Sequence, residues 1–410
     1  MGDDLQIDID IPRYFICPIS LEIMKDPVTL STGITYDRDS IEQWLFSKKN
    51  EVCPVTKQVV LDIELTPNHT LRRLIQSWCT INASLGIERF PTPKPAISKT
   101  EIIKLLKDSK SPHLQIKSLN RLKTIVLENE KNKRMMESAG AFNQLTTIIS
   151  NVYDHDIIMS SSSPEVSGAD EALTILYHLK LSQAGLKFLF GKAGNFVETL
   201  AHVMQRAVSF ESRAYAIMLL KSMFEVAEPV QVTSLTLSFF KEIVQILNDQ
   251  ISQKATKATL KLLINVCPWG RNRIKAAENG VVSALIDILL DCTDKRVSEM
   301  IIILLDHVCQ CAEGRAELMK HGGGLAVISK KIFRVSSVAS ERAVKILYSM
   351  TMFSGNSRVV QEMMELGVVE KLILVLQIDC GRKIKEKARE MLKVNARVWK
   401  KSPCITYDLI

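Results

Sequence analysis

The first part of the chain combines two short strand-like runs with two amphipathic helices. Residues 28–30 and 34–36 flank a Ser-Thr-Gly turn, which predicts a β-hairpin. A helix is predicted over residues 38–46 behind Asp37 as N-cap, and a second helix follows Asn68. The apolar positions predicted to face the core are Ile41 with Leu45 or Trp44 in the first helix, and Leu71, Leu74, Ile75 and Trp78 in the second. Residues 11–86 are therefore interpreted as one compact α/β unit.

The remainder of the chain repeats a helical pattern with a period of about 42 residues. A small residue followed by an apolar helix recurs at positions 140, 194, 238, 280, 323 and 367, so the spacings are 54, 44, 42, 43 and 44 residues. Five of these residues are glycines, which can end one helix in the left-handed conformation and let the next helix start at an angle. Helical repeats of this length stack into an α-solenoid.

Two segments interrupt the repeating pattern. Pro91, Pro93 and Pro95 form a run that favours an extended spacer over a helix. We therefore predict a linker at 87–99, a solenoid from 100 to 400 and a tail over the last ten residues, 401–410. The 54-residue spacing exceeds the others by about ten residues, which predicts an inserted loop at 154–170. The four serines 160–163 in that loop are either phosphorylation sites or part of a tolerated insertion.

Charge divides the chain at the same linker. The whole sequence has 53 basic and 45 acidic side chains, a formal net charge of +8. Residues 1–86 contain 8 basic and 12 acidic side chains (−4), which leaves 45 basic and 33 acidic (+12) for the rest. A basic body favours a partner with an acidic face. The most basic stretch, residues 382–401, keeps apolar residues at helical spacing, so it fits a solenoid end cap better than a nucleic-acid or acidic-membrane tail.

The cysteines and the start of the chain bear on cellular location. The sequence contains nine cysteines, an odd number, and it begins without a basic segment followed by an apolar one. No uncharged apolar run is long enough to span a membrane. The cysteines are therefore expected to be reduced, in a protein of the cytoplasm or also of the nucleus.

Two Cys-Pro loops lie on either side of the hairpin and first helix. Residues 15–22 are FICPISLE, and residues 51–58 are EVCPVTKQ. Zinc RING domains contain similar segments, but their ligands come largely as C-x₂-C pairs, and residues 11–86 contain no such pair. We therefore predict neither a metal nor another cofactor. Packing and hydrogen bonds would support the loops instead, through Cys17, Glu22, Asp26, Asp37, Arg38, Cys53 and Thr56.

Four ordered motifs in residues 11–86, called the front unit below, resemble a U-box, a zinc-free RING-like domain. They are FICPISLEIMKDPV at 15–28, GITYDR at 33–38, CPVTKQ at 53–58 and LTPNHTLR at 65–72. With the repeats, they resemble plant U-box armadillo-repeat E3 ubiquitin-protein ligases. Two further segments, residues 71–79 and 89–95, are similar to the stress- and immunity-linked branch of that family.

The resemblance implies that a ubiquitin-conjugating enzyme (E2) carrying ubiquitin docks on both loops and the central helix. Matching the motifs residue by residue gives Ile19, Leu21, Trp44, Pro54 and Lys57. No cysteine would accept the ubiquitin, because Cys17 and Cys53 precede proline in apolar loops, where a thiol is expected to stay protonated and inert. The ligase would instead act by proximity. Core packing for the apolar residues, and plain solvent exposure for Lys57, are the alternatives.

The repeats over about 100–400 resemble armadillo repeats, which implies an all-α superhelix whose third helices line a substrate groove. Nuclear-import receptors carry an asparagine ladder on these helices, and the aligned positions here are Thr124, His178, Ser222, Asn265, His307 and Ser349. One asparagine is not a ladder, so binding of nuclear-localisation signals in that manner is not expected. The two histidines are interpreted as groove lining rather than as catalysts.

The sequence therefore predicts a multidomain E3 ubiquitin ligase, with an α/β U-box followed by an all-α armadillo superhelix. The U-box would recruit ubiquitin-loaded E2, and ubiquitin would pass to lysines of a protein substrate on the repeats, in plant defence or stress signalling. A homo-oligomer is a further expected partner, and nucleic acid is not. The main alternative is a non-catalytic armadillo interaction scaffold, whose front unit mediates dimerisation or sequesters an E2.

Overall fold

The computed structural model of the chain describes residues 11–47, 52–60, 64–83, 97–153, 168–191, 196–353 and 357–400. Contacts group the chain into two compact units, one up to Ala141 and one from Phe142 onward. Most of the predicted linker at 87–99 and of the inserted loop at 154–170, and the whole of the tail at 401–410, lie outside the described residues. None of the described helices is long and apolar enough to cross a membrane.

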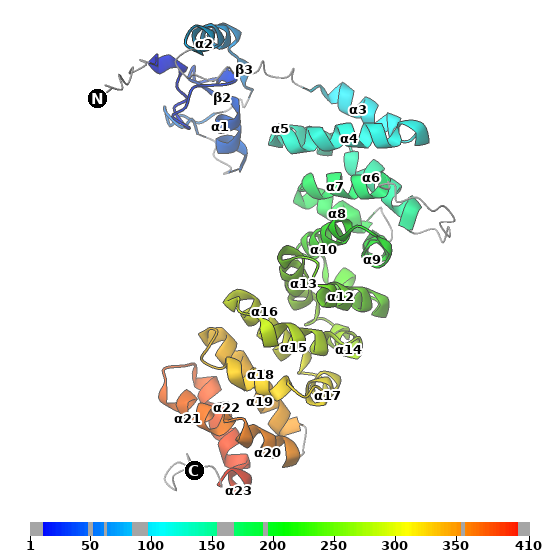
Figure 1. Cartoon of the computed structure of the whole chain (residues 1–410), viewed down its shortest axis with the longest axis vertical. Coiled ribbons are helices and arrows are strands. Elements are labelled where there is room, and N and C mark those ends of the chain that lie inside the picture. The colour runs from blue at the N-terminus through cyan, green and yellow to red at the C-terminus, as the bar shows by residue number, and fades with distance from the viewer. Residues whose placement is uncertain are drawn as a thin grey trace, which may run out of the picture. The chain divides into compact units, whose positions relative to one another are not determined.

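The first described part of the chain combines a small antiparallel sheet with the helices α1 and α2 (Figure 1). The sheet has the strand order β2-β1-β3, so β1 lies in the middle, and Val28 pairs with Tyr36 on one side and Pro67 on the other. The elements are the 3₁₀ turn Arg13–Phe15, β1 Pro27–Thr29, β2 Thr35–Asp37, α1 Arg38–Glu42, a π-helix Gln43–Ser47, β3 Thr66–Pro67 and α2 His69–Ile81.

The predicted hairpin and helices of this region are confirmed, with local differences. The two hairpin strands are each displaced by one residue from the predicted runs, and the third strand β3 was not predicted. The first helix changes from α to π geometry after Glu42. The second helix begins as predicted, because the Asn68 side chain accepts a hydrogen bond from Leu71 N at 3.0 Å.

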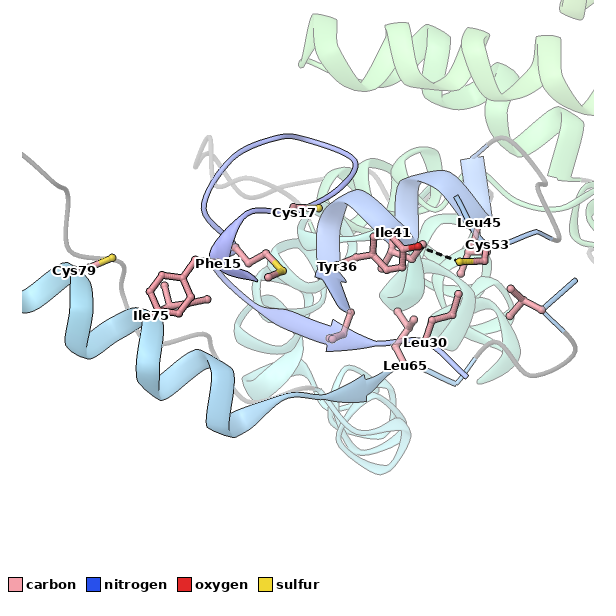
Figure 2. Close-up of a cluster of buried hydrophobic side chains, with 13 residues drawn as sticks. Phe15, Cys17, Leu30, Tyr36, Ile41, Leu45, Cys53, Leu65, Ile75 and Cys79 are labelled. Atoms are coloured by element: carbon pink, nitrogen blue, oxygen red, sulfur yellow. Dashed lines mark hydrogen bonds between the residues drawn. The ribbon is translucent and has the colours of Figure 1, made fainter. Parts of the chain in front are cut away.

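One apolar cluster holds this region together, and Figure 2 shows it between the sheet, α1 and α2. It contains Phe15, Cys17, Met24, Val28, Leu30, Tyr36, Ile41, Leu45, Cys53, Val60, Leu65, Ile75 and Cys79. The prediction that Leu74 faces this core is wrong, because 52% of its surface is exposed. Successive helical residues are rotated by about 100°, so Ile75 faces inward and Leu74 lies at the edge of the apolar face.

The rest of the described chain is helical. The helices are α3 Lys99–Asp108, α4 Pro112–Glu128, α5 Glu130–Ser138, α6 Ala141–Tyr153, α7 Gly168–His178, α8 Gln183–Gly191, α9 Phe196–Arg206, α10 Phe210–Phe224, α11 Pro229–Thr233, α12 Leu237–Asp249, α13 Gln253–Val266, α14 Asn272–Glu278, α15 Val281–Asp291, α16 Lys295–Val308, α17 Ala312–Lys320, α18 Gly324–Lys331, α19 Ser337–Phe353, α20 Ser357–Glu365, α21 Val368–Gln377, α22 Arg382–Val394 and α23 Ala396–Trp399.

In the second unit these helices stack as repeats (Figure 1). The long helices α7, α10, α13, α16, α19 and α22 each pack against the next in that series and form one continuous layer. The glycine argument holds at Gly280 and Gly367, whose φ angles of 83° and 68° lie in the left-handed region. It is wrong at Gly323, where φ is −98° and the backbone N–H instead donates to His321 Nδ1.

Candidate functional site

The two Cys-Pro loops have the same backbone construction. In the first loop, Cys17 N donates to Glu22 O at 2.8 Å and Leu21 N donates to Cys17 O at 2.9 Å. In the second, Cys53 N donates to Gln58 O at 2.8 Å and Lys57 N donates to Cys53 O at 3.0 Å. A β-bridge closes each loop. Ile16 pairs with Ile23 in the first loop, and Val52 pairs with Val59 in the second. The similarity of the two sequences therefore extends to three dimensions.

Each loop contains one non-glycine residue in the left-handed conformation, at the same position after the cysteine. These residues are Leu21 with φ 60° and Lys57 with φ 58°. For an L-residue this conformation costs roughly 1–2 kcal/mol relative to the right-handed one. Leu21 is 76% exposed, and Lys57 is also exposed. The loops thus hold these two side chains on the surface at an energetic cost, as binding sites often do.

Strand β2 connects the two loops through their cysteine sulfurs. Asp37 N donates to Cys17 Sγ at 3.3 Å, and Tyr36 OH lies 3.0 Å from Cys53 Sγ (Figure 2). Tyr36 OH also accepts from Val55 N at 3.4 Å. Neighbouring residues of one strand therefore fix both loops.

Burial does not raise the net pKa of either thiol, although apolar surroundings were expected to keep both protonated. Burial raises the pKa of Cys53, but hydrogen bonds from Thr32, Thr56 and Tyr36 outweigh it and lower the pKa to about 6. Burial of Cys17 is similarly outweighed by hydrogen bonds, chiefly from Ser20 and Asp37, so that its pKa is lowered. The loops supply donors to the sulfur as well as apolar surroundings. Both side chains nevertheless have no exposed surface.

A cluster of charged side chains joins the loops to α1 and α2. Arg38 Nε lies 2.6 Å from Asp26 Oδ2, and Arg72 Nη1 lies 3.3 Å from Asp26 Oδ1. Asp37 Oδ1 accepts from the backbone N–H groups of Lys25 and Asp26 at 2.7 and 2.9 Å. The predicted supporting roles of Asp26, Asp37 and Arg38 thus have contacts in the structure.

Glu22 and Thr56 support the loops differently from what the residue types suggested. The exposed Glu22 contributes its backbone carbonyl, which accepts from Cys17 N. Thr56 contributes both its backbone N–H, which donates to Cys53 Sγ at 3.5 Å, and its hydroxyl, which accepts from Gln58 N at the same distance. Within the part of the chain that the structure describes, no cluster of three or more His, Cys, Asp or Glu could hold a metal ion.

The five residues expected to contact an E2 occupy different environments. Leu21 and Lys57 are exposed, Pro54 is half-buried, and Ile19 and Trp44 are partly buried against the core. Trp44 Nε1 donates to Val52 O at 3.0 Å, and Lys57 Nζ lies 5.9 Å from the centroid of the Trp44 ring. The helix and the second loop are therefore brought together, and both alternatives for Trp44, core and surface, hold in part.

Sequence reasoning missed two residues that the site depends on. Arg72 completes the ion pairs of Asp26, and Tyr36 carries the hydroxyl shared by Cys53 and Val55. Both lie inside the quoted motifs GITYDR and LTPNHTLR. A buried tyrosine needs a hydrogen-bond partner for its hydroxyl, and that requirement was the available signal for Tyr36.

The predicted groove residues lie on the long helices, but several of their side chains make hydrogen bonds to backbone carbonyls of the repeats. Asn265 Nδ2 donates to Phe224 O at 2.7 Å, and Ser349 Oγ donates to Cys309 O at 3.2 Å, each one repeat earlier. Ser222 bonds within its own helix to Met218 O, as Thr124 does to Asn120 O and Arg121 O.

The two histidines of this series differ from each other. His178 Nε2 lies 3.5 Å from Tyr215 OH, and Tyr215 stacks on Tyr177 with ring centroids 4.4 Å apart. Burial lowers the pKa of His307, which therefore favours the neutral ring.

Comparison with known proteins matches both parts of the chain. The family model of the U-box domain matches residues 11–84, and that of the plant U-box protein ARM repeat region matches residues 100–410. The chain is 53% identical to the E3 ubiquitin-protein ligase PUB22 of Arabidopsis thaliana, over 98% of each chain. It is 54% identical to the E3 ubiquitin-protein ligase PUB23 of the same plant, over 100% of this chain and 98% of the relative.

A comparison of structures supports the fold of the repeats. A solved structure described as "A conserved phosphorylation switch controls the interaction between cadherin and beta-catenin in vitro and in vivo" matches with a TM-score of 0.57 and 15% identity. The match covers 81% of this chain and 58% of that chain.

Proposed function

Because the chain belongs to the plant U-box proteins with an ARM repeat region and is a U-box E3 ubiquitin ligase, we propose that its two Cys-Pro loops and Trp44 form the surface on which the E2 docks. The contacting residues would be Ile19, Leu21, Trp44, Pro54 and Lys57. The observation that carries this assignment is the matched left-handed pair, since Leu21 at 76% exposure has no packing reason to occupy a strained conformation.

Ubiquitin then passes from the E2 directly to a substrate lysine. A covalent ubiquitin intermediate would need a thiol that the E2 thioester can reach. Cys17 and Cys53 carry lowered pKa values, but neither side chain has exposed surface and both sulfurs accept hydrogen bonds from strand β2 or the loops. Burial thus argues against an acceptor role, while proximity to the bound E2 supplies the catalytic effect.

The armadillo layer is the proposed substrate-holding surface. His178, Ser222, Asn265, His307 and Ser349 lie on the consecutively packed helices α7, α10, α13, α16 and α19, which supports a continuous surface along them. Self-association, a place in defence or stress signalling, a cytoplasmic or nuclear location and the domain limits at 86 and 100 stay predictions of the sequence.

Replacing Leu21 by glycine tests the docking surface without straining the loop. Leu21→Gly keeps a residue that tolerates φ 60°, so the thermal unfolding of the protein should change little while E2-dependent ubiquitin chain formation falls at least roughly tenfold, the cost of about 1.4 kcal/mol of interface energy. Ile81→Ala is the matched control, because Ile81 is 77% exposed in the same region. Equal activity of both variants and the wild type would refute the assignment of Leu21.

A further inference from the structure

A basic cavity of about 190 Å³ lies where the α15–α16 connection meets the end of α18. Four cationic side chains line it, Lys295, Lys330, Lys331 and Arg334, together with the hydroxyl-bearing Thr293 and Ser298. No acidic side chain is among its described lining residues. Such a concentration of like charge is unfavourable unless an anion compensates it.

Two carboxylates near this cavity, those of Asp294 and Glu299, are engaged elsewhere. Asp294 Oδ2 pairs with Lys257 Nζ at 2.9 Å, while its Oδ1 caps α16 by accepting from Arg296 N at 2.8 Å. Glu299 accepts a hydrogen bond from Ser336 Oγ. Among the described residues, the side chains of Lys295, Lys330 and Arg334 have no hydrogen-bond or ion-pair partner, so these charges are available to a ligand.

Two further observations show that positively charged side chains lie close together around this cavity. Lys331 Nζ donates to Cys292 O at 2.9 Å, which fixes its ammonium beside the cavity. Burial lowers the pKa of Lys371, and the nearby Arg334 guanidinium lowers it further. Lys371 Nζ is held by Ser329 O and Ser329 Oγ, both at 2.7 Å.

Backbone strain positions the arginine. Phe333 precedes Arg334 and has φ 61°, a left-handed conformation that is a marked outlier for a bulky residue. Two anchors hold it there, since Phe333 N donates to Ser340 Oγ at 2.9 Å and Ile332 is buried with 2% exposure. Strain of this kind persists where the surrounding structure enforces it, and it is concentrated at ligand-binding sites.

A second cavity of about 360 Å³ adjoins the first and shares Lys295, Arg334 and Val335 with it. Its wall includes apolar side chains from three helices and the connection after α21, namely Val344, Val375, Ile378 and Ile384. Glu341 and Asp379 also line this second cavity, so the two cavities differ in charge. The first suits an anion, and the second suits an apolar side chain next to it.

We propose that these cavities form a docking site for a phosphorylated serine or threonine of a partner protein. The phosphate would bind Lys295, Lys330, Lys331 and Arg334, and an adjacent apolar side chain would enter the second cavity. A phosphoryl group carries nearly two negative charges and three acceptor oxygens, which matches several cations better than a single carboxylate does. The concave site at a junction of repeats favours a peptide over a flat membrane surface. The proposal rests on the proposed function only in taking the partner to be a ubiquitination substrate.

The test measures binding of the full-length protein to a fluorescent pool of peptides with one fixed phosphoserine and degenerate flanks. The phosphorylated pool should bind, select apolar residues beside the phosphoserine, and be displaced by inorganic phosphate, whereas the unphosphorylated pool should not bind. Arg334→Glu should weaken binding roughly tenfold or more, as expected for loss of a charge-assisted hydrogen bond. Lys254→Glu, at an exposed lysine of α13 outside both cavities, makes the same charge change and should have no effect.

Two readouts separate this proposal from the E3 mechanism. Autoubiquitination should be normal in Arg334→Glu, and phosphopeptide binding should be normal in Leu21→Gly. Equal binding of both peptide pools, or equal loss with Lys254→Glu, overturns the phosphate site. So does a response of Arg334→Glu confined to nucleic acid or to vesicles containing phosphoinositides. Loss of transfer by Arg334→Glu with peptide binding intact would likewise contradict the assigned role.

Discussion

Cys53 is a buried hydrogen-bond acceptor. Its sulfur lies within reach of three groups, Thr32 Oγ1 at 3.4 Å, Tyr36 OH at 3.0 Å and Thr56 N at 3.5 Å. A thiolate accepts these hydrogen bonds more strongly than a thiol does, which favours the charged form despite burial. The residue therefore contributes to loop stability through its charge state.

This charge state predicts a specific pH dependence of stability. The pKa of Cys53 falls from an ordinary 9.0 to about 6 on folding, so its contribution is fully present above pH 9 and is lost as the pH falls through 6. The free energy of unfolding of the wild type relative to Cys53→Ser should thus rise between pH 6 and 9, by at most ~1.4 kcal/mol per pH unit. Denaturant unfolding across this range measures it. A difference that stays flat would mean an ordinary thiol pKa.

At the scale of elements, strand β2 fixes the relative position of the two loops. Its side chain at Tyr36 bonds the second loop, and its backbone at Asp37 bonds the first. The sheet behind β2 pairs Val28 with Tyr36, so the strand cannot shift without breaking that register. A docking surface assembled from two loops requires such a shared support.

Replacing Tyr36 by phenylalanine tests this support. Tyr36→Phe keeps the ring in the core but removes the hydroxyl that serves Cys53 and Val55, which should cost about 1–3 kcal/mol of unfolding free energy. E2-dependent transfer should fall with it, and the pH dependence attributed to Cys53 should shrink because one donor to its sulfur is gone. Tyr14→Phe, at a ring that is 64% exposed, is the control. Transfer at the wild-type rate with lowered stability would show that β2 does not position the loops.

The elements also show how far sequence reasoning extends. The Asn68 cap, the hairpin and the repeat period depend on local rules, and the sequence predicted them correctly. The π-helix after α1, the exposure of Leu74 and the left-handed Leu21 and Lys57 depend on which tertiary contacts form. The loops contain no glycine that would indicate a positive φ. A Cys-Pro motif also does not show how many hydrogen-bond donors will surround the cysteine sulfur. For these reasons the motifs indicate the two loops but do not indicate the lowered pKa of their thiols.

At the scale of the whole molecule, hydrogen bonds between repeats recur at a separation of about 40 residues. Asn272 Nδ2 donates to Val232 O, Lys331 Nζ to Cys292 O and Trp399 Nε1 to Val360 O, all between 2.8 and 2.9 Å. Val232 lies near the end of α11 and Cys292 directly follows α15, whereas Val360 lies within α20. Stacked repeats are stabilised largely by their nearest neighbours, so these contacts affect the cooperativity of the solenoid.

Asn272 and Asn265 provide a matched test of the coupling between repeats. They also test whether ubiquitin transfer is independent of the stability of the repeats. Asn272 is fully buried, so Asn272→Ala removes the donor to Val232 O, while Val266 O keeps its hydrogen bond from Trp269 N at 3.2 Å. The substitution should cost about 1–3 kcal/mol. Asn265 makes one inter-repeat hydrogen bond from an exposed position, so Asn265→Ala should cost less than ~1 kcal/mol.

Unfolding followed by circular dichroism, which is dominated by the helical repeats, should separate the two asparagine variants. Autoubiquitination should remain at the wild-type level in both below the unfolding transition, because the proposed E2-docking residues all lie in the front unit and none contacts either asparagine. Cooperative loss of autoubiquitination together with the repeat transition would show instead that the ligase functions as one folding unit. In that case a substrate held on the repeats could change transfer activity through stability alone, and variants of the repeats would have to be compared at equal fractions of folded protein.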